Sequence, residues 1–146
     1  MTITRRELCV LLSGVFPAAV ALDALPAEDN SIPSAHYAFD QLPVEVLDHA
    51  EMRRVLKGKL ATGEALEVHE TTLPAGGAPH APHHHLHSEM WFIREGTVEL
   101  TVNGTNYRLG PGGVGFVHSN DQHGIKNVGT TAATYFVVAI GPGADA

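Results

Sequence analysis

Histidine is the most unusual feature of this sequence of 146 residues, because its ten copies are unevenly distributed. Five of them fall within residues 80–87, and a carboxylate, Glu89, follows closely. Alternate side chains of a β-strand point to the same face of the sheet. On a strand without a bulge, that face would carry His83, His85, His87, Glu89, Trp91 and Ile93. A row of imidazoles and a carboxylate leading into apolar residues is typical of a pocket that holds a divalent cation, because a cation accepts lone pairs that are costly to bury.

Two other interpretations of the histidine-rich stretch remain open at this point. It could be a solvated loop, or an adventitious metal-binding tract resembling an affinity tag, although such a tract would be terminal. The single cysteine, Cys9, excludes an internal disulfide and a thiolate metal site. Any metal ion would therefore be held by nitrogen and oxygen atoms.

The elements that must position these residues are predicted to be strands. From about residue 60 onward, glycines recur at short spacing and separate runs rich in β-branched residues. Residues 97–109 predict a hairpin, in which Asn103-Gly104 forms a tight type I′ turn. The run 133–140 is apolar on both faces, which predicts a strand covered on each side. Only residues 43–57 could hold a short helix, so the pattern favours an all-β closed barrel or sandwich.

The spacing of the histidines resembles the first motif of the cupin superfamily, G-x5-H-x-H-x3,4-E-x6-G. Residues 77–96 fill every fixed position of this motif. These positions are Gly77, His83, His85, Glu89 and Gly96. The resemblance implies an antiparallel double-stranded β-helix, the jelly-roll barrel of the cupins, over residues from about 65 to 140.

Residues 112–127 resemble the second cupin motif, G-x5-P-x-G-x2-H-x3-N, with two departures. His118 replaces the proline and Asn120 replaces the glycine. Asparagine tolerates a left-handed backbone better than other non-glycine residues, so we expect the turn to survive at Asn120.

By this resemblance, four residues would bind one divalent metal ion. They are His83, His85, Glu89 and His123. Three imidazoles and one carboxylate suit Fe, Mn, Ni, Co or Zn, and the sequence does not choose among these ions. An octahedral ion would keep two adjacent positions open for water, substrate or dioxygen.

The remaining histidines are assigned less directly. His84 should point outward from the strand, whereas His87 could support the metal site or simply be structural. His118 precedes His123 on a loop at the barrel mouth, and it is our candidate for an acid–base or substrate contact. His80 could line the mouth or have no role. His69, on the preceding strand, is interpreted as an ordinary strand position, as is Glu70.

The N-terminus has the layout of an export signal. Residues 1–7 are basic, and residues 8–21 are apolar and end in Ala-Val-Ala. Arg5-Arg6 resembles a twin-arginine signal, and an ordinary Sec signal is the alternative. We therefore predict a signal peptide at 1–21, a flexible leader at 22–35, a single barrel domain at 36–146, and a periplasmic location.

Composition limits the partners. The formal net charge of −7, with scattered lysines and arginines, argues against nucleic-acid binding. After signal cleavage, no membrane-spanning segment is expected. The extra apolar residues on the outer face, such as Met90 and Phe92, predict a homodimer, unless residues 36–60 cover that face.

Three functions are compatible with the sequence. The first is a metal-dependent enzyme of the dioxygenase, isomerase or lyase type that acts on a small, neutral or weakly charged organic substrate. The alternative is a non-catalytic protein that binds a small molecule or a metal ion. In the third, a metal ion only stabilises the barrel. The resemblance supports the metal site better than any reaction, because one fold carries many activities.

Overall fold

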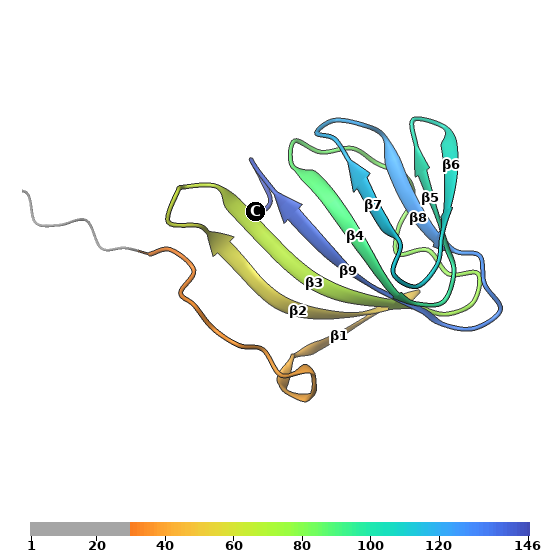
Figure 1. Ribbon diagram of the computed structural model, residues 1–146, viewed down its shortest axis with the longest axis horizontal. Coiled ribbons are helices and arrows are strands. Elements are labelled where there is room, and N and C mark those ends of the chain that lie inside the picture. Colours follow the sequence, from red (N-terminus) through yellow and green to blue (C-terminus); the bar gives the residue numbers. More distant parts are fainter. Residues whose placement is uncertain (1–29) are drawn as a thin grey trace, which may run out of the picture.

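The computed structural model describes residues 30–146, where nine strands form two antiparallel sheets (Figure 1). The elements are η1 (Phe39–Gln41), β1 (Val44–Leu47), β2 (Ala50–Lys59), β3 (Ala65–Leu73), β4 (Ser88–Glu95), β5 (Val98–Val102), β6 (Thr105–Leu109), β7 (Val114–Val117), β8 (His123–Asn127) and β9 (Ala133–Ile140). One sheet has the order β1-β2-β3-β9-β4-β7 and the other β6-β5-β8. The fold is the all-β, jelly-roll arrangement predicted from the sequence.

Two details of the sequence prediction are confirmed and one is wrong. Asn103 and Gly104 both have positive φ angles, 47° and 81°, as the turn between β5 and β6 requires. Asn120 keeps its turn with a φ of 65°. The helix considered for residues 43–57 is wrong, because this segment forms β1 and most of β2. Here pairing along β3 decides the structure, not local helix propensity.

The described part of the chain excludes most of the predicted export region. The predicted signal peptide, 1–21, and most of the predicted leader, 22–35, lie outside it. Within residues 30–146, no helix is long and apolar enough to cross a membrane.

The hydrophobic core lies between the two sheets. Alternate residues of β4 and β9 point inward, so Trp91 and Val137 are 3 % exposed. They pack with Leu100 and Ile125 of the smaller sheet in one cluster. The outward residues of β9, Phe136 and Val138, are only half-buried, so the expected cover on that face is incomplete within the described residues. This core fixes β4 and β8 relative to each other.

Gly96, directly after β4, allows the chain to turn against the start of β9. Its φ is 77°, and an added Cβ would lie 2.6 Å from the Cα of Ala133. We expect Gly96→Ala to lower the free energy of unfolding by roughly 2–3 kcal/mol, from backbone strain and overpacking together. Urea denaturation measures this.

Gly112 supplies the matched control. Its φ is 80°, but an added Cβ would meet no atom of residues 30–146 within 4 Å. Gly112→Ala should therefore show the cost of the left-handed backbone alone. Equal losses in the two variants would contradict the argument.

Candidate metal centre and its cavity

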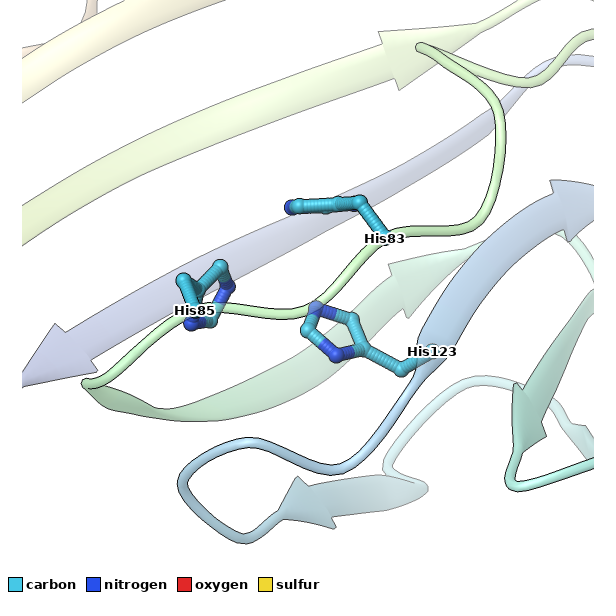
Figure 2. Close-up of side chains that lie close together, drawn as sticks. All are labelled: His83, His85 and His123. Atoms are coloured by element: carbon cyan, nitrogen blue, oxygen red, sulfur yellow. The ribbon is translucent and has the colours of Figure 1, made fainter.

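The candidate site is formed where the segment before β4 meets the start of β8. His83 and His85 lie in that segment, Glu89 lies on β4, and His123 is the first residue of β8. The backbones of His83 and His123 exchange two hydrogen bonds, of 2.9 and 2.8 Å. Figure 2 shows the imidazoles of His83, His85 and His123 extending from these two segments toward a shared space.

The four residues implied by the resemblance come together in the structure. The potential ligand atoms of His83, His85 and His123 lie within 4.8 Å of one another. Glu89 Oε1 is 3.2 Å from His85 Nε2. Its other oxygen, Oε2, is 3.5 Å from His123 Nε2. The two segments thus bring one carboxylate and three imidazoles into one cluster.

The imidazoles are oriented so that nitrogen lone pairs face the cluster. His85 Nδ1 donates to the carbonyl of His87 at 3.0 Å, and His123 Nδ1 donates to that of Asp121 at 2.9 Å. Within residues 30–146, the Nε2 atoms of His85 and His123 are buried and have no hydrogen-bond partner, and the same is true of His83 Nδ1. Such atoms are costly unless something occupies their lone pairs. A divalent ion would do so, and a backbone bond that fixes the tautomer is typical of metal-binding histidines.

The cluster also shifts the pKa values of its members. Burial lowers the pKa of His83 to about 4, helped by the neighbouring His80 and His123. Burial disfavours the charged forms of His123 and Glu89, but their mutual attraction outweighs it. The pKa of His123 is therefore raised, and the pKa of Glu89 is lowered. At neutral pH, His83 is neutral and Glu89 is ionised.

These shifts predict how metal binding depends on pH. A proton competes with a metal ion for an imidazole lone pair, and the raised pKa of His123, caused by Glu89, extends this competition to higher pH than for an ordinary imidazole. We expect affinity for Zn²⁺ to fall as the pH is lowered through the neutral range, with proton release on binding. Calorimetry in buffers of different ionisation enthalpy measures both. A flat affinity between about pH 8 and pH 6 would contradict it.

A cavity of about 260 Å³ opens beside the cluster, between the two sheets. Glu89 and His123 lie in its wall, and Trp91 and Ile125 form part of its apolar lining. The other lining residues are Leu47, Met52, Glu67, His69, Thr71, Pro79, His80, Gly124, Tyr135 and Val137. Among the described residues, the lining includes no lysine or arginine. A strongly anionic ligand therefore has no complementary side chain here.

The sequence interpretation missed Glu67 and His69. Both lie on β3 and line the cavity, so His69 is not an ordinary strand position. The His69 Nδ1 atom is buried, 3.7 Å from Glu67 Oε1, and has no hydrogen-bond partner in the part of the chain that the structure describes. Burial lowers the pKa of His69, although Glu67 opposes the shift. The alternation Glu67, His69, Thr71 was the available signal, because it places three polar residues on one face of a strand.

The other predicted residues are placed as follows. His84 is exposed, as expected for an outward side chain. His80 is exposed and borders the cavity. His118 is exposed on the loop after β7, and its Nδ1 donates to the carbonyl of Ser119 at 2.9 Å. It is not among the cavity-lining residues, so its acid–base role stays a prediction.

The sequence around the candidate site matches a known protein family. Residues 69–139 match the model of the Cupin domain family. This segment is similar to cupin domains. The match contains β4, β8 and all four residues of the candidate metal centre.

Solved cupins share the fold at low sequence identity. An RmlC-like cupin from Shewanella frigidimarina is 19 % identical with a TM-score of 0.63, over 77 % of this chain and 96 % of that chain. KdgF from Halomonas sp. is 15 % identical with a TM-score of 0.63, over 73 % of this chain and 94 % of that chain. These likenesses support the cupin fold and no particular activity.

A curated relative is more similar in sequence but only over part of its length. The L-ectoine synthase of Bordetella petrii is 40 % identical over 73 residues, which cover 49 % of this chain and 53 % of that protein. The chain thus spans about half the length of the curated relatives it matches.

Proposed function

We propose that this cupin is a metal-dependent enzyme that acts on a small, neutral or weakly charged organic substrate. The observation that carries the proposal is the set of buried, unpartnered nitrogens of His83, His85 and His123 facing Glu89 beside a cavity. One ion of Fe, Mn, Ni, Co or Zn, held by His83, His85, Glu89 and His123, would polarise a bound oxygen or activate water.

The cavity supports a substrate without strong negative charge. In the described part of the chain, its lining carries the carboxylates of Glu67 and Glu89 and no side chain that is always cationic. Apolar atoms of Trp91 and Ile125 would contact the carbon skeleton of a substrate. The volume of about 260 Å³ limits that substrate to a small molecule.

The polar wall of β3 would supply proton transfer. His69 is neutral at neutral pH because burial lowers its pKa, so its unpartnered Nδ1 can accept or donate a proton. Glu67 Oε1 lies 3.7 Å from His69 Nδ1 and 3.6 Å from Arg54 Nε. Glu67 would stabilise positive charge that develops on the imidazole. We therefore propose His69 as the acid–base residue and Glu67 as its partner.

The curated relatives are consistent with an enzyme. The matching proteins from Bordetella are L-ectoine synthases, so formation of L-ectoine is the first activity to assay. Because the chain spans only about half their length, other small substrates belong in the same experiment.

The test compares protein loaded with each metal, chelator-treated protein, and two variants. Under the proposal, turnover depends on metal, and His69→Gln loses it while keeping the bound metal. His118→Ala tests the earlier acid–base candidate in parallel. Metal-independent turnover would contradict the proposal. Tight ligand binding without turnover would instead favour the non-catalytic binding protein.

We also propose that the protein is a homodimer, formed through an apolar patch on the outer face of β4 and β7. The patch consists of Phe92, Val114 and Phe116, which are 40 %, 53 % and 57 % exposed. Phe92 pairs directly with Val114 in the sheet. Apolar side chains gathered in this way are typical of surfaces covered by another subunit.

Light scattering of the wild type and of Phe116→Glu tests this proposal. We expect a dimer mass for the wild type and a monomer mass for the variant, because a buried carboxylate would lack a partner. Val46→Glu is the control, since Val46 is 77 % exposed on β1, away from the patch. A monomeric wild type at micromolar concentration would contradict the proposal.

Export to the periplasm is a further proposal, supported only by residues 1–21 of the sequence. Cell fractionation with N-terminal sequencing of the mature protein tests it, and a cytoplasmic protein with an intact N-terminus would refute it.

A further inference from the structure

His87 is the fourth histidine at the candidate metal centre, and neither cupin motif accounts for it. Its Nε2 forms a hydrogen bond with Glu89 Oε1 at 3.3 Å. Its ring stacks on that of His85, with centroids 3.5 Å apart and planes 15° apart. The side chain is half-buried. His87 therefore contacts two of the proposed ligands at once.

The orientation of the two stacked rings distinguishes their roles. The Nε2 atoms of His85 and His87 lie almost equally far from Glu89 Oε1, at 3.2 and 3.3 Å. Among the residues that the structure describes, only His87 makes a hydrogen bond to this oxygen, whereas His85 Nε2 has no hydrogen-bond partner. His85 carries its proton on Nδ1, which donates to the carbonyl of His87. A carboxylate only accepts, so His87 must carry its proton on Nε2.

We propose that His87 is a positioning residue that holds Glu89 in the orientation required for metal binding. Its Nε2–H occupies Oε1 of the carboxylate. The other oxygen, Oε2, lies 3.5 Å from His123 Nε2, so the carboxylate is held between His87 and the histidines of the proposed ligand set. The inference rests on the proposed metal centre and adds a residue outside its ligand set.

Two neighbours border His87, and the stacked ring of His85 is the one that restrains its imidazole. The ring of His85 covers one face. The C-terminal segment after β9 borders the residue closely, since a Cβ added at Gly141 would lie 3.6 Å from His87 Cα. A Cβ added at Gly143 would lie 4.0 Å from His87 Nδ1. A donor fixed in this way directs a carboxylate with little loss of side-chain freedom.

The first test measures metal affinity for three variants of the full chain by competition between the protein and a chelator for Zn²⁺. His87→Phe keeps a stacked ring without a donor, His87→Gln keeps an N–H donor, and His84→Ala is an exposed control from the same motif. We expect His87→Phe to weaken affinity by about 10–100-fold, with His87→Gln recovering most of the loss and His84→Ala unchanged. Equal affinity for wild type and His87→Phe would overturn the proposal.

X-ray absorption of the Zn²⁺-loaded proteins separates a positioning residue from a ligand. The number of coordinating histidines should be the same in wild type and His87→Phe at saturating metal. A count lower by one in the variant would make His87 a ligand and overturn the positioning role.

A third measurement does not depend on the metal. In the metal-free protein, ¹⁵N NMR of the imidazoles should show His87 protonated on Nε2 and His85 on Nδ1. The opposite tautomer at His87 would overturn the inference even if the metal centre is confirmed. Conversely, a wild type that binds no ion would refute the proposed metal centre while the His87 tautomer is still observed.

Discussion

Protein purified without a histidine tag should contain close to one equivalent of a divalent metal ion, and His123→Ala should contain almost none. His123 is 2 % exposed and is the only proposed ligand that comes from the second motif. Its removal deletes one nitrogen and also leaves Glu89 Oε2 without its nearby imidazole. We expect affinity for Zn²⁺ to fall by at least about 100-fold. This loss is larger than the loss expected for His87→Phe, which removes a positioning residue and no ligand. Elemental analysis and chelator competition measure it.

His84→Ala is the matched control for His123→Ala. It removes an imidazole that lies between two proposed ligands but is exposed. It should therefore retain the wild-type metal content and affinity. Thermal unfolding gives an independent check, because metal at 100 times its dissociation constant should stabilise the wild type by about 2.7 kcal/mol and leave His123→Ala unchanged. A full equivalent of metal in His123→Ala would refute the proposed ligand set.

The fold was predictable because its local and global signals agree. Asn103-Gly104 encodes the β5–β6 turn, and alternation along β4 places Trp91 and Ile93 in the core. The misjudged segment was 43–57, where the signal was weak. The strand β2 in this segment depends on β3, which supplies the partners of Arg53 and Leu56 through pairing that local sequence does not specify.

Only part of the candidate site could be predicted from the sequence. His83, His85 and Glu89 lie close together in the sequence, so a short motif can identify them. The wall formed by Glu67 and His69 faces those residues only after β3 pairs with β9 and closes the cavity. The protonation pattern that separates His87 from His85 depends on hydrogen bonds of the folded backbone. Residue spacing therefore predicts neither that Glu67 and His69 face the histidines nor which nitrogens of His85 and His87 are protonated.

Asn127 links the two motifs, so its replacement should strongly destabilise the protein. It is fully buried, and its Nδ2 donates to the carbonyls of Leu73, Pro74 and Thr131 at 3.1, 3.0 and 2.8 Å. Its Oδ1 accepts from the backbone N–H of Gly129 at 2.9 Å. Asn127→Leu would leave four backbone groups without this partner. Only the bond to Leu73 is fully buried, so water can replace part of the others, and at about 1–3 kcal/mol for a buried group we expect a loss of about 2–3 kcal/mol in the free energy of unfolding.

The consequence of this loss should extend to the metal centre. The backbone of Asn127 also pairs with Gly76 and Gly77, at the start of the segment that leads to His83, while β8 begins with His123. Asn127 thus fixes the two ligand-bearing segments relative to each other. Urea denaturation of the metal-free protein measures the destabilisation, with Asn106→Leu, an exposed position on β6, as the control. If Asn127→Leu unfolds at the wild-type urea concentration, the buried amide does not hold the two motifs together.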